Sequence, residues 1–423
     1  MYYPIIDRET IYENLHIYLL LFFVLLVLSI FIYIKLSFPF WNNQPVYHSY
    51  DFWRYLYTRP FIIQKRFPIK SRFCDFDNIE TQEFVDISGT GVTELIDLLQ
   101  CHYVSSDSTF FIFHRDNLNA YFVGHQYPCY FSFYRKPPPS INQTKYGTKN
   151  TTWKRVEEAH KKDDVIKGCV SSRPMEFSYN GEQHTIYFVD FICVNRELDK
   201  KDIMRRLLQT HDYRIRIREP IQISLLKKEG EPYHGVVPII KHQSYVYDIL
   251  KDVERPQLPL HFLIKEITYK NINILVDFIG TLRLKFSVFG ITSLGNIVEM
   301  LKAKILFVFC VYRKEEIHGL YFFRDSRTQY EIMGKNGPLL HFFGSIQNSN
   351  SQQLFYDGFL HTLGAILKTT NVFRYLMIEN ISHNFLVLDF LDRKPFLEID
   401  QFYYTLNYFI PKKLNPRTCL IIS

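Results

Sequence analysis

The sequence lacks the short motifs that identify several common kinds of site. Its 423 residues include seven cysteines, but no two of them stand at C-x-x-C spacing. Neither a zinc ribbon nor a thioredoxin-type motif is therefore encoded, and the odd count with wide spacing suits a reducing compartment. No basic run is interleaved with aromatic residues in the pattern of a nucleic-acid-binding module. We expect no metal site and no nucleic-acid partner.

Aromatic residues are abundant, with 38 Phe and 30 Tyr making up most of a 17% aromatic fraction. This composition is far from that of a disordered chain and supports a large apolar core. The length allows two or three average domains or one large double domain. The net charge of +7 is modest and favours an anionic surface or ligand.

One long hydrophobic run lies near the start of the chain, at residues 17–34, and it contains no charged residue. At about 1.5 Å per residue, a helix of this length nearly spans a hydrocarbon core of about 30 Å. Tyr18 and Tyr33 stand near its two ends, where interfacial residues are common. A buried core helix seldom stays apolar on all sides, and no small-residue cleavage site follows. We therefore predict an uncleaved membrane anchor over residues 1–37.

Basic residues flank this run unequally. Only Arg8, among three acids, precedes it, whereas Lys35 and six further Lys or Arg residues follow it up to position 72. The positive-inside rule then predicts a single-pass protein whose large carboxyl-terminal portion is cytosolic.

The remaining chain mixes helix and strand patterns, which predicts an α/β protein. Prolines between residues 38 and 75 predict an irregular segment, and helices are expected near 93–99 and 203–208. Asn180-Gly181, between apolar runs at 177–179 and 185–191, predicts a hairpin. Further strands are expected at residues 110–113, 130–134, 305–312, 319–323, 387–390 and 403–408. The pattern partly restarts near residue 256, which indicates two halves, 38–255 and 256–423.

Five segments carry more specific information: FWNNQPV at 40–46, LLQCHYVSSDSTFFIF at 98–113, GCVSSRPMEFSYNGEQHTIYFVDFICV at 168–194, KHQS at 241–244 and YYTLNY at 403–408. In this order they resemble segments of the eukaryotic glycylpeptide N-tetradecanoyltransferases, or N-myristoyltransferases. The ending CLIIS at 419–423 is similar to the end of that family.

The resemblance implies a tandem, acetyltransferase-like double fold preceded here by a transmembrane helix. It also implies transfer of a tetradecanoyl group from acyl-CoA to the N-terminal glycine of protein substrates. The first half would bind acyl-CoA, and the second would bind peptide and supply a terminal carboxylate. Tetradecanoyl-CoA would be a co-substrate, with no permanently bound cofactor. The expected partners are acyl-CoA, glycine-initiated proteins and the membrane, and the protein is expected to be a monomer.

The resemblance also assigns the reaction centre. Phe191 and Ile192 match a pair whose backbone N–H groups hold the oxyanion, and fixed dipoles there stabilise charge that develops in the transition state. Asp190 replaces an asparagine and could either assist proton removal or repel the oxyanion. Ser423 would supply its terminal carboxylate as the base. Proton transfer from an amine of pKa about 7.8 to a carboxyl of about 3.5 is uphill by roughly 6 kcal/mol in water, and burial narrows that gap.

The same matching gives the binding residues. Phe40, Trp41, Gln44, Arg196, Lys200 and Lys201 would contact acyl-CoA, and Tyr103, Asp107, Phe111, Phe113, His242 and Ser244 would contact the peptide. The family has a basic R-S-K-R phosphate clamp where this chain has Asp199-Lys200-Lys201-Asp202, and the two aspartates are electrostatically unfavourable there. The family's Y-T-A-G segment falls on LLKK at 225–228.

These departures leave two alternatives. One is a catalytically weak relative that binds acyl-CoA or lipopeptides without turnover, which the aspartates at 199 and 202 favour. The other is a structural membrane protein that reuses the scaffold, which the loss of the Y-T-A-G segment favours.

Overall fold

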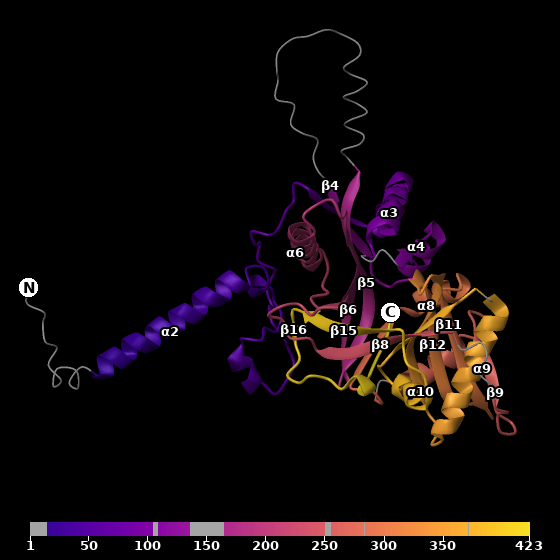
Figure 1. Cartoon of the computed structure of the whole chain (residues 1–423). Helices are drawn as coiled ribbons and strands as arrows, with labels where there is room; N and C mark the ends of the chain where they lie inside the picture. Colours follow the sequence, from indigo (N-terminus) through magenta and orange to yellow (C-terminus); the bar gives the residue numbers. More distant parts are fainter. Residues whose placement is uncertain (1–14, 105–108, 136–164, 250–254, 283, 371) are drawn as a thin grey trace, which may run out of the picture.

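The computed structural model describes residues 15–104, 109–135, 165–249, 255–282, 284–370 and 372–423. Helix α2 (Leu15–Ser37) projects from the folded body, and none of its residues is buried (Figure 1). The predicted long apolar helix is therefore present, and its length and composition are those of a helix that could cross a membrane. The next segment contains only short 3-10 turns and strand β1 (Phe61–Ile62), as its prolines predict.

A large mixed sheet forms the centre of the molecule. From one edge to the other its strands follow the order β17 (Cys419–Ile422), β10 (Val288–Thr292), β5 (Ile166–Tyr179), β6 (Glu182–Val194), β7 (Ser224–Glu229), β15 (Leu397–Leu406), β8 (Ile240–Asp248), β14 (Tyr375–Glu379), β13 (Lys335–Gln347), β12 (Glu316–Ile332), β11 (Leu306–Arg313) and β9 (Leu263–Ile267). Off this path, β4 (Tyr130–Arg135) pairs with β5 and β2 (Ile79–Glu83), and β3 (Thr109–Phe111) pairs with β12. Separately, β1 pairs with β16 (Tyr408–Phe409).

Helices cover the sheet and bury its apolar side chains. They are α3 (Gly89–His102), α4 (Arg115–Phe122), α6 (Lys200–Arg218), α7 (Asn273–Leu282), α8 (Leu294–Lys302), α9 (Gln352–Thr370) and α10 (Asn384–Phe390). Helix α6 packs on β4, β5 and β6, whereas α9 packs on β11 and β12 on the other side of the molecule (Figure 1). Two large apolar clusters lie beneath these layers.

The two halves of the chain share this sheet. Strands β10 and β17, from the second half, pair beside β5 of the first half. Strand β15, also from the second half, lies between β7 and β8. In return, β3 of the first half pairs with β12. Each half therefore completes the sheet of the other.

Most predicted elements are present. The hairpin of β5 and β6 turns at Asn180 and Gly181, whose φ angles of 46° and 87° are those that a tight hairpin turn requires. The prediction of a strand at 387–390 is wrong, because these residues belong to α10. A short apolar run does not distinguish strand from helix, and here Leu386 and Val387 pack in the same cluster as α9. The predicted strand 403–408 is broken at Asn407, where φ is 60°.

Candidate functional site

The pairing between β6 and β7 ends inside the sheet. The two strands run parallel and pair over three residues only, the last pair being Val189 and Leu226. Beyond this pair β6 remains bonded to β5, and β7 remains bonded to β15. Val189, Leu226 and Phe40 belong to one apolar cluster, which also receives α6 through Ile203. The break therefore places backbone groups of β6 beside an apolar region.

Strand β6 also carries a bulge at this break. The register with β5 shifts between Cys169 and Ser171, so that Phe191 and Ile192 together oppose one residue. Phe191 has a positive φ of 48°, which is strained for a residue with a side chain. Its ring is buried and packs 5.6 Å from Tyr103 and 5.5 Å from Phe113, measured between ring centroids. This packing holds the strained backbone and fixes the direction of the Phe191 N–H.

The Asp190 carboxylate uses that N–H in this structure. Its Oδ1 accepts from the Phe191 N–H at 2.8 Å and from the Tyr103 hydroxyl at 3.4 Å. Its Oδ2 lies 3.3 Å from the guanidinium of Arg173, whose side chain is only 2% exposed. Burial, together with the nearby charge of Asp190, raises the pKa of Tyr103 well above its usual value. The predicted oxyanion donor at Phe191 therefore already has an anionic partner.

The predicted aromatic peptide contacts come together beside this bulge. Tyr103 follows α3, Phe111 ends β3, and their ring centroids lie 4.9 Å apart. Phe111 in turn stacks on Phe113 at 5.0 Å. These rings belong to one cluster with Phe191. Asp107, the predicted acidic contact, lies outside the described residues.

His242 and Ser244, the other predicted peptide contacts, lie on β8 and are buried. The Nε2 of His242 is 2.9 Å from an oxygen of Glu379 on β14. The same carboxylate lies 2.6 Å from the Nζ of Lys227 and 2.7 Å from the Nε2 of His341. Although burial alone would raise it, the pKa of Glu379 is held well below its usual value by the charge of Lys227 and by the contacts with His341 and His242.

Sequence reasoning missed this Glu379 cluster. Glu379, Lys227 and His341 stand on β14, β7 and β13, and no spacing in the sequence connects them. The one available signal was the pair of lysines in LLKK, where the related family has small and hydroxyl residues. The structure turns Lys227 into this buried network, where its pKa is raised because Glu379 outweighs the effect of burial.

Ser423 follows β17 and is 8% exposed. Strand β17 pairs in parallel with β10, so that the four apolar residues before Ser423 are all buried. The main-chain oxygen of Ser423 accepts a hydrogen bond from Arg324 of β12. The charge of Arg324 acts on Tyr121 and on Arg173, and Asp190 acts on the same two groups. Arg324, which contacts the predicted base, and Asp190, which contacts the bulge, therefore influence the same two side chains.

The segment predicted to bind phosphate, residues 199–202, begins with an aspartate that caps helix α6. Asp199 is the N-cap of α6, and its carboxylate accepts from the N–H groups of Lys201 and Asp202 at 3.1 and 3.2 Å. Lys200 and Lys201 themselves are exposed. Arg196 donates to the carbonyl of Val104, after α3. The first amides of α6 are thus already occupied, whereas two lysine side chains remain at the surface.

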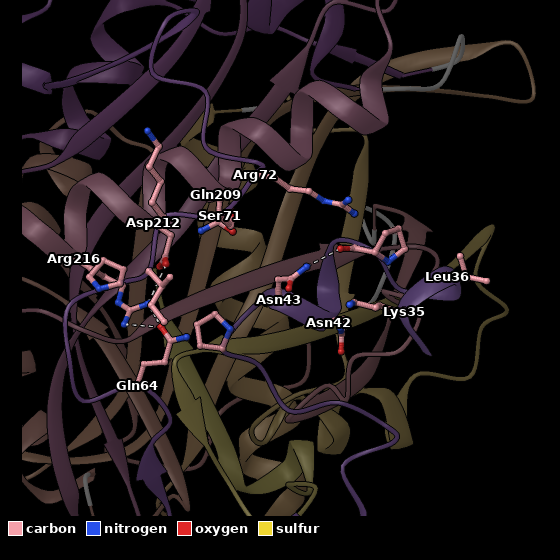
Figure 2. Close-up of a pocket in the computed structure, with 15 residues that line it drawn as sticks. Lys35, Leu36, Asn42, Asn43, Gln64, Ser71, Arg72, Gln209, Asp212 and Arg216 are labelled. Atoms are coloured by element: carbon pink, nitrogen blue, oxygen red, sulfur yellow. Dashed lines mark hydrogen bonds and ion pairs between the residues drawn. The ribbon is translucent and has the colours of Figure 1, made fainter. Parts of the chain in front are cut away.

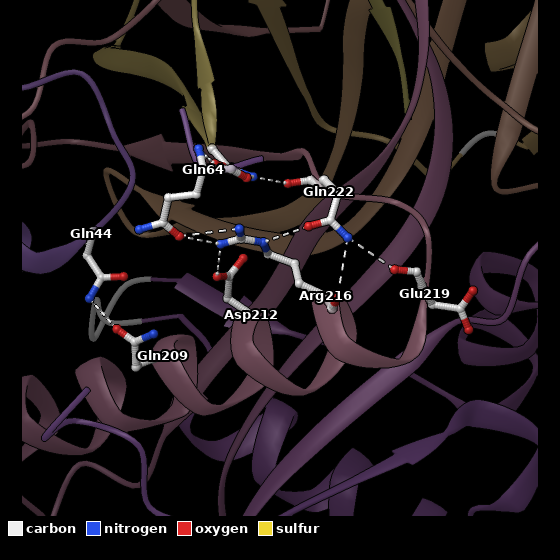
Figure 3. Close-up of polar contacts among 8 residues, drawn as sticks. Gln44, Gln64, Gln209, Asp212, Arg216, Glu219 and Gln222 are labelled. Atoms are coloured by element: carbon white, nitrogen blue, oxygen red, sulfur yellow. Dashed lines mark hydrogen bonds and ion pairs between the residues drawn. The ribbon is translucent and has the colours of Figure 1, made fainter. Parts of the chain in front are cut away.

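The segment after α2 packs over α6. Phe40 is 2% exposed and contacts Phe73 edge-on, with ring centroids 5.1 Å apart. Trp41 lies 4.6 Å from the ring of Tyr233. Gln44 donates to Gln209 of α6, and Figure 3 shows the two side chains facing each other. The three predicted acyl-CoA contacts therefore lie in or beside one apolar cluster that also contains Ile203 of α6.

The fold defined by these elements is that of the N-myristoyltransferases. Two structures of Saccharomyces cerevisiae N-myristoyltransferase with bound myristoyl-CoA match 90% of this chain, with TM-scores of 0.65 and 0.64, at 14% identity, and the matches cover 95% and 91% of the yeast chains. A third, with bound myristoyl-CoA and inhibitors, matches 90% of this chain and 92% of the yeast chain, with a TM-score of 0.63 and 15% identity. No model of a protein family and no curated protein matches the sequence. The predicted double α/β fold is confirmed.

Proposed function

We propose that this protein transfers a tetradecanoyl group from tetradecanoyl-CoA to the N-terminal glycine of protein substrates. The observation that carries the proposal is the strained bulge at Phe191, placed where β6 and β7 separate. Bound myristoyl-CoA in the yeast proteins of the same fold gives further support.

In the proposed reaction the amine of the substrate glycine attacks the thioester carbonyl. A C–N bond forms, the C–S bond breaks, and the CoA thiolate leaves and takes up a proton. The N–H groups of Phe191 and Ile192 are the proposed donors to the oxyanion that forms on the way. The proposed base is the α-carboxylate of Ser423, which accepts the proton of the glycine ammonium. Its burial favours this role, because desolvation raises the pKa of a carboxyl and lowers that of an amine, whereas the hydrogen bond from Arg324 opposes the first effect.

Asp190 competes with the proposed oxyanion for a backbone donor. Its carboxylate accepts from the Phe191 N–H, which the oxyanion would also need. The oxyanion must therefore replace the carboxylate at that donor, or it must rely on Ile192 alone. Because two negative charges would lie side by side, the reaction is slowed unless Asp190 moves toward Arg173.

Acyl-CoA is proposed to contact Phe40, Trp41 and Gln44 of the segment after α2. Lys200, Lys201 and Arg196 are proposed to face its phosphates. The peptide is proposed to lie against Tyr103, Phe111 and Phe113, with His242, Ser244 and Asp107 completing its contacts.

Helix α2 is proposed to be a single-pass anchor that leaves the folded body in the cytosol. Its 23 residues contain no buried side chain, and its single basic residue, Lys35, lies in the last turn. This position agrees with the positive-inside rule.

The test is an acyl-transfer assay with the full chain in lipid nanodiscs. Radiolabelled tetradecanoyl-CoA is offered with a glycine-initiated peptide and with the same peptide starting with alanine. We expect transfer to the first peptide only. Adding one residue after Ser423 displaces the carboxylate and should lower the rate by at least about 100-fold. The matched control Ser423→Ala keeps the carboxylate and should keep the activity.

A second candidate is a binding protein without turnover. Asp190 and Asp199 occupy backbone donors that acyl transfer and phosphate binding would use, and this observation favours it. It predicts saturable binding of tetradecanoyl-CoA, measured by calorimetry, with no labelled peptide formed. Labelled peptide in the assay above excludes it.

A further inference from the structure

The surface that follows α2 exposes an unusual number of large apolar side chains. Phe52, Trp53 and Leu56 belong to one 3-10 turn, and Phe67 and Ile69 follow shortly after. All five are between 71% and 80% exposed. Single exposed apolar residues are ordinary, but a group of this size marks a surface that contacts another apolar phase.

This apolar surface lies beside the end of α2. Ile69 and Pro68 line one cavity together with Lys35 and Leu36, which belong to the last turn of that helix. In Figure 1 the indigo segments after α2 lie on the side of the folded body from which α2 projects. A bilayer crossed by α2 would therefore face these side chains.

The shared cavity has a volume of about 670 Å³ and a basic rim. Lys35 comes from α2, Lys70 and Arg72 come from the segment after β1, and Arg216 comes from α6 (Figure 2). Among the described residues that line it, Asp212 is the only acid. The cavity therefore favours an anionic group.

The basic residues of the cavity differ in their partners within the described chain: Arg216, at the floor, is bonded to an acid, and Lys35, Lys70 and Arg72, at the rim, are not. Arg216 is 2% exposed and donates to Asp212 at 3.3 Å, to Gln64 at 3.3 Å and to Gln222 at 3.4 Å (Figure 3). In contrast, Lys35, Lys70 and Arg72 form no ion pair with an acid in the part of the chain that the structure describes. Each lies instead over an aromatic ring: Lys35 is 5.3 Å from the centroid of Phe31, Lys70 is 4.9 Å from that of Phe76, and Arg72 is 5.0 Å from that of Phe73. A ring does not neutralise a cation, so the rim keeps a positive charge that an anionic ligand can approach.

The position of the cavity along α2 matches the depth of lipid phosphates. The apolar run ends at Ile34, and the headgroup layer on each side of a bilayer is roughly 5–8 Å thick. At about 1.5 Å per residue, Lys35 and Leu36 lie within the first few ångströms of that layer. Trp and Tyr side chains are enriched at the same depth.

We propose that residues 52–72 and the cavity at the end of α2 form a lipid-binding surface, in which Phe52, Trp53 and Leu56 enter the membrane interface and the basic rim holds the phosphate-bearing headgroup of an anionic lipid. The surface rests on the proposed anchoring by α2 but not on acyl transfer. It orients the folded body on the membrane, since a single helix alone leaves the body free to rotate.

The first test measures contact with lipid. The full chain is placed in nanodiscs of phosphatidylcholine with brominated acyl chains, and its retention in the membrane is checked by alkaline extraction. The sequence contains three tryptophans, so Trp53→Phe is compared with the unchanged chain. We expect brominated lipid to quench a large fraction of the tryptophan fluorescence of the unchanged chain and a much smaller fraction of that of Trp53→Phe. Equal fractional quenching in the two proteins overturns the apolar contact, and failure to stay in the membrane overturns the anchor itself.

The second test measures selection of the headgroup. Short-chain phosphatidylserine is titrated into the detergent-solubilised full chain, and inorganic phosphate is titrated in a parallel arm. Lys70→Gln with Arg72→Gln should weaken binding of the lipid by about 30-fold, at about 1 kcal/mol for each basic residue. The control Lys302→Gln with Lys304→Gln removes two exposed lysines at the same spacing, one at the end of α8 and one in the turn that follows, and should leave binding unchanged.

Either of two results overturns the headgroup site. One is equal weakening in both double variants, which would indicate a general effect of net charge. The other is binding of inorganic phosphate as tight as that of the lipid, which would indicate a site for a soluble anion. A protein partner on the same surface would show as Trp53 fluorescence that brominated lipid does not quench. None of these readouts depends on acyl transfer, so that their outcome is separate from that of the proposed reaction.

Discussion

Asp190 and Glu379 are both acids beside buried cations, yet their surroundings differ. Glu379 is 2% exposed, and its oxygens lie within 2.9 Å of three basic side chains. The side chain of Asp190 is 26% exposed, and its one cationic partner, Arg173, lies 3.3 Å away. Glu379 therefore links strands β7, β8, β13 and β14 through its contacts with Lys227, His242 and His341. Asp190 has a longer contact with Arg173 alone among these cations, and its carboxylate remains partly exposed to solvent.

This difference separates a structural acid from one that a ligand can displace. Removing the carboxylate of Glu379 leaves Lys227, whose side chain is 19% exposed, without its ion-pair partner inside the sheet, which is unfavourable. Displacing Asp190 from the Phe191 N–H exchanges one hydrogen bond for another, which involves a much smaller free energy. We therefore expect substitutions at Glu379 to change stability, and substitutions at Asp190 to change activity in addition to any loss of stability from the buried Arg173.

The largest effect is expected for Glu379→Gln. Loss of the carboxylate leaves Lys227, whose side chain is 19% exposed, without a counter-charge, and breaking such a largely buried pair lowers the free energy of unfolding by about 3 kcal/mol. Urea denaturation followed by circular dichroism measures this change. Glu398→Gln, at an exposed position on β15, is the matched control and should change stability by less than about 0.5 kcal/mol. Equal stability of the two variants would show that the cluster is not structural.

Acid should weaken the Glu379 cluster next. Burial lowers the pKa of His341 below its usual value, although Glu379 opposes this effect. His341 thus contributes stability above the unfolded histidine pKa of about 6.5, and this contribution is lost as the pH falls toward its folded pKa. Glu379, whose folded pKa is lowered, loses its contribution only below about 4.3. His341→Asn should therefore reduce the slope of stability against pH just below 6.5 by up to about 1.4 kcal/mol per pH unit.

Denaturation midpoints between pH 7 and 4 measure this slope. The control His261→Asn changes an exposed histidine in a turn and should keep the slope of the unchanged chain. A slope that His341→Asn leaves intact would place the acid sensitivity elsewhere, for example at buried His211, whose pKa burial lowers to about 3.

Asp190→Asn tests the other side of the comparison. It removes a negative charge beside the proposed oxyanion, and kcat for acyl transfer should rise about tenfold, or about 1.4 kcal/mol in barrier. The rate is measured per folded protein, because Arg173 loses its counter-charge. A tenfold fall instead would mean that Asp190 assists proton removal, which is the alternative that the sequence left open.

The smallest effect is expected for Tyr103→Phe. The hydroxyl lies 3.4 Å from Asp190, so its loss should lower the free energy of unfolding by at most about 1 kcal/mol, while the ring keeps its packing on Phe111. Thermal melting measures the change. A loss greater than about 2 kcal/mol would mean that the contact between Tyr103 and Asp190 contributes nearly as much stability as the contacts of Glu379 do.

Several features could be predicted because they depend on local sequence. The Asn180-Gly181 turn specifies its hairpin through its backbone preferences, and the uncharged run before Lys35 specifies one long helix. The motif around Phe191 was located by its resemblance to a known family, and the structure places it at a bulge. By contrast, the run at 387–390 has no local feature that separates strand from helix, and its packing with α9 decides the matter.

The sequence by itself determined the α/β class, the apolar helix, the hairpin and the order of the family-like segments, because turn preferences and hydrophobic periodicity act between near neighbours. The tertiary structure alone decided that Lys227, His242 and His341 share Glu379, and that Asp190 accepts from Phe191. It also brought Lys35 and Arg72 to one cavity. The pairing of charges across strands depends on sheet register and side-chain direction, and neither is written in the spacing of residues along the chain.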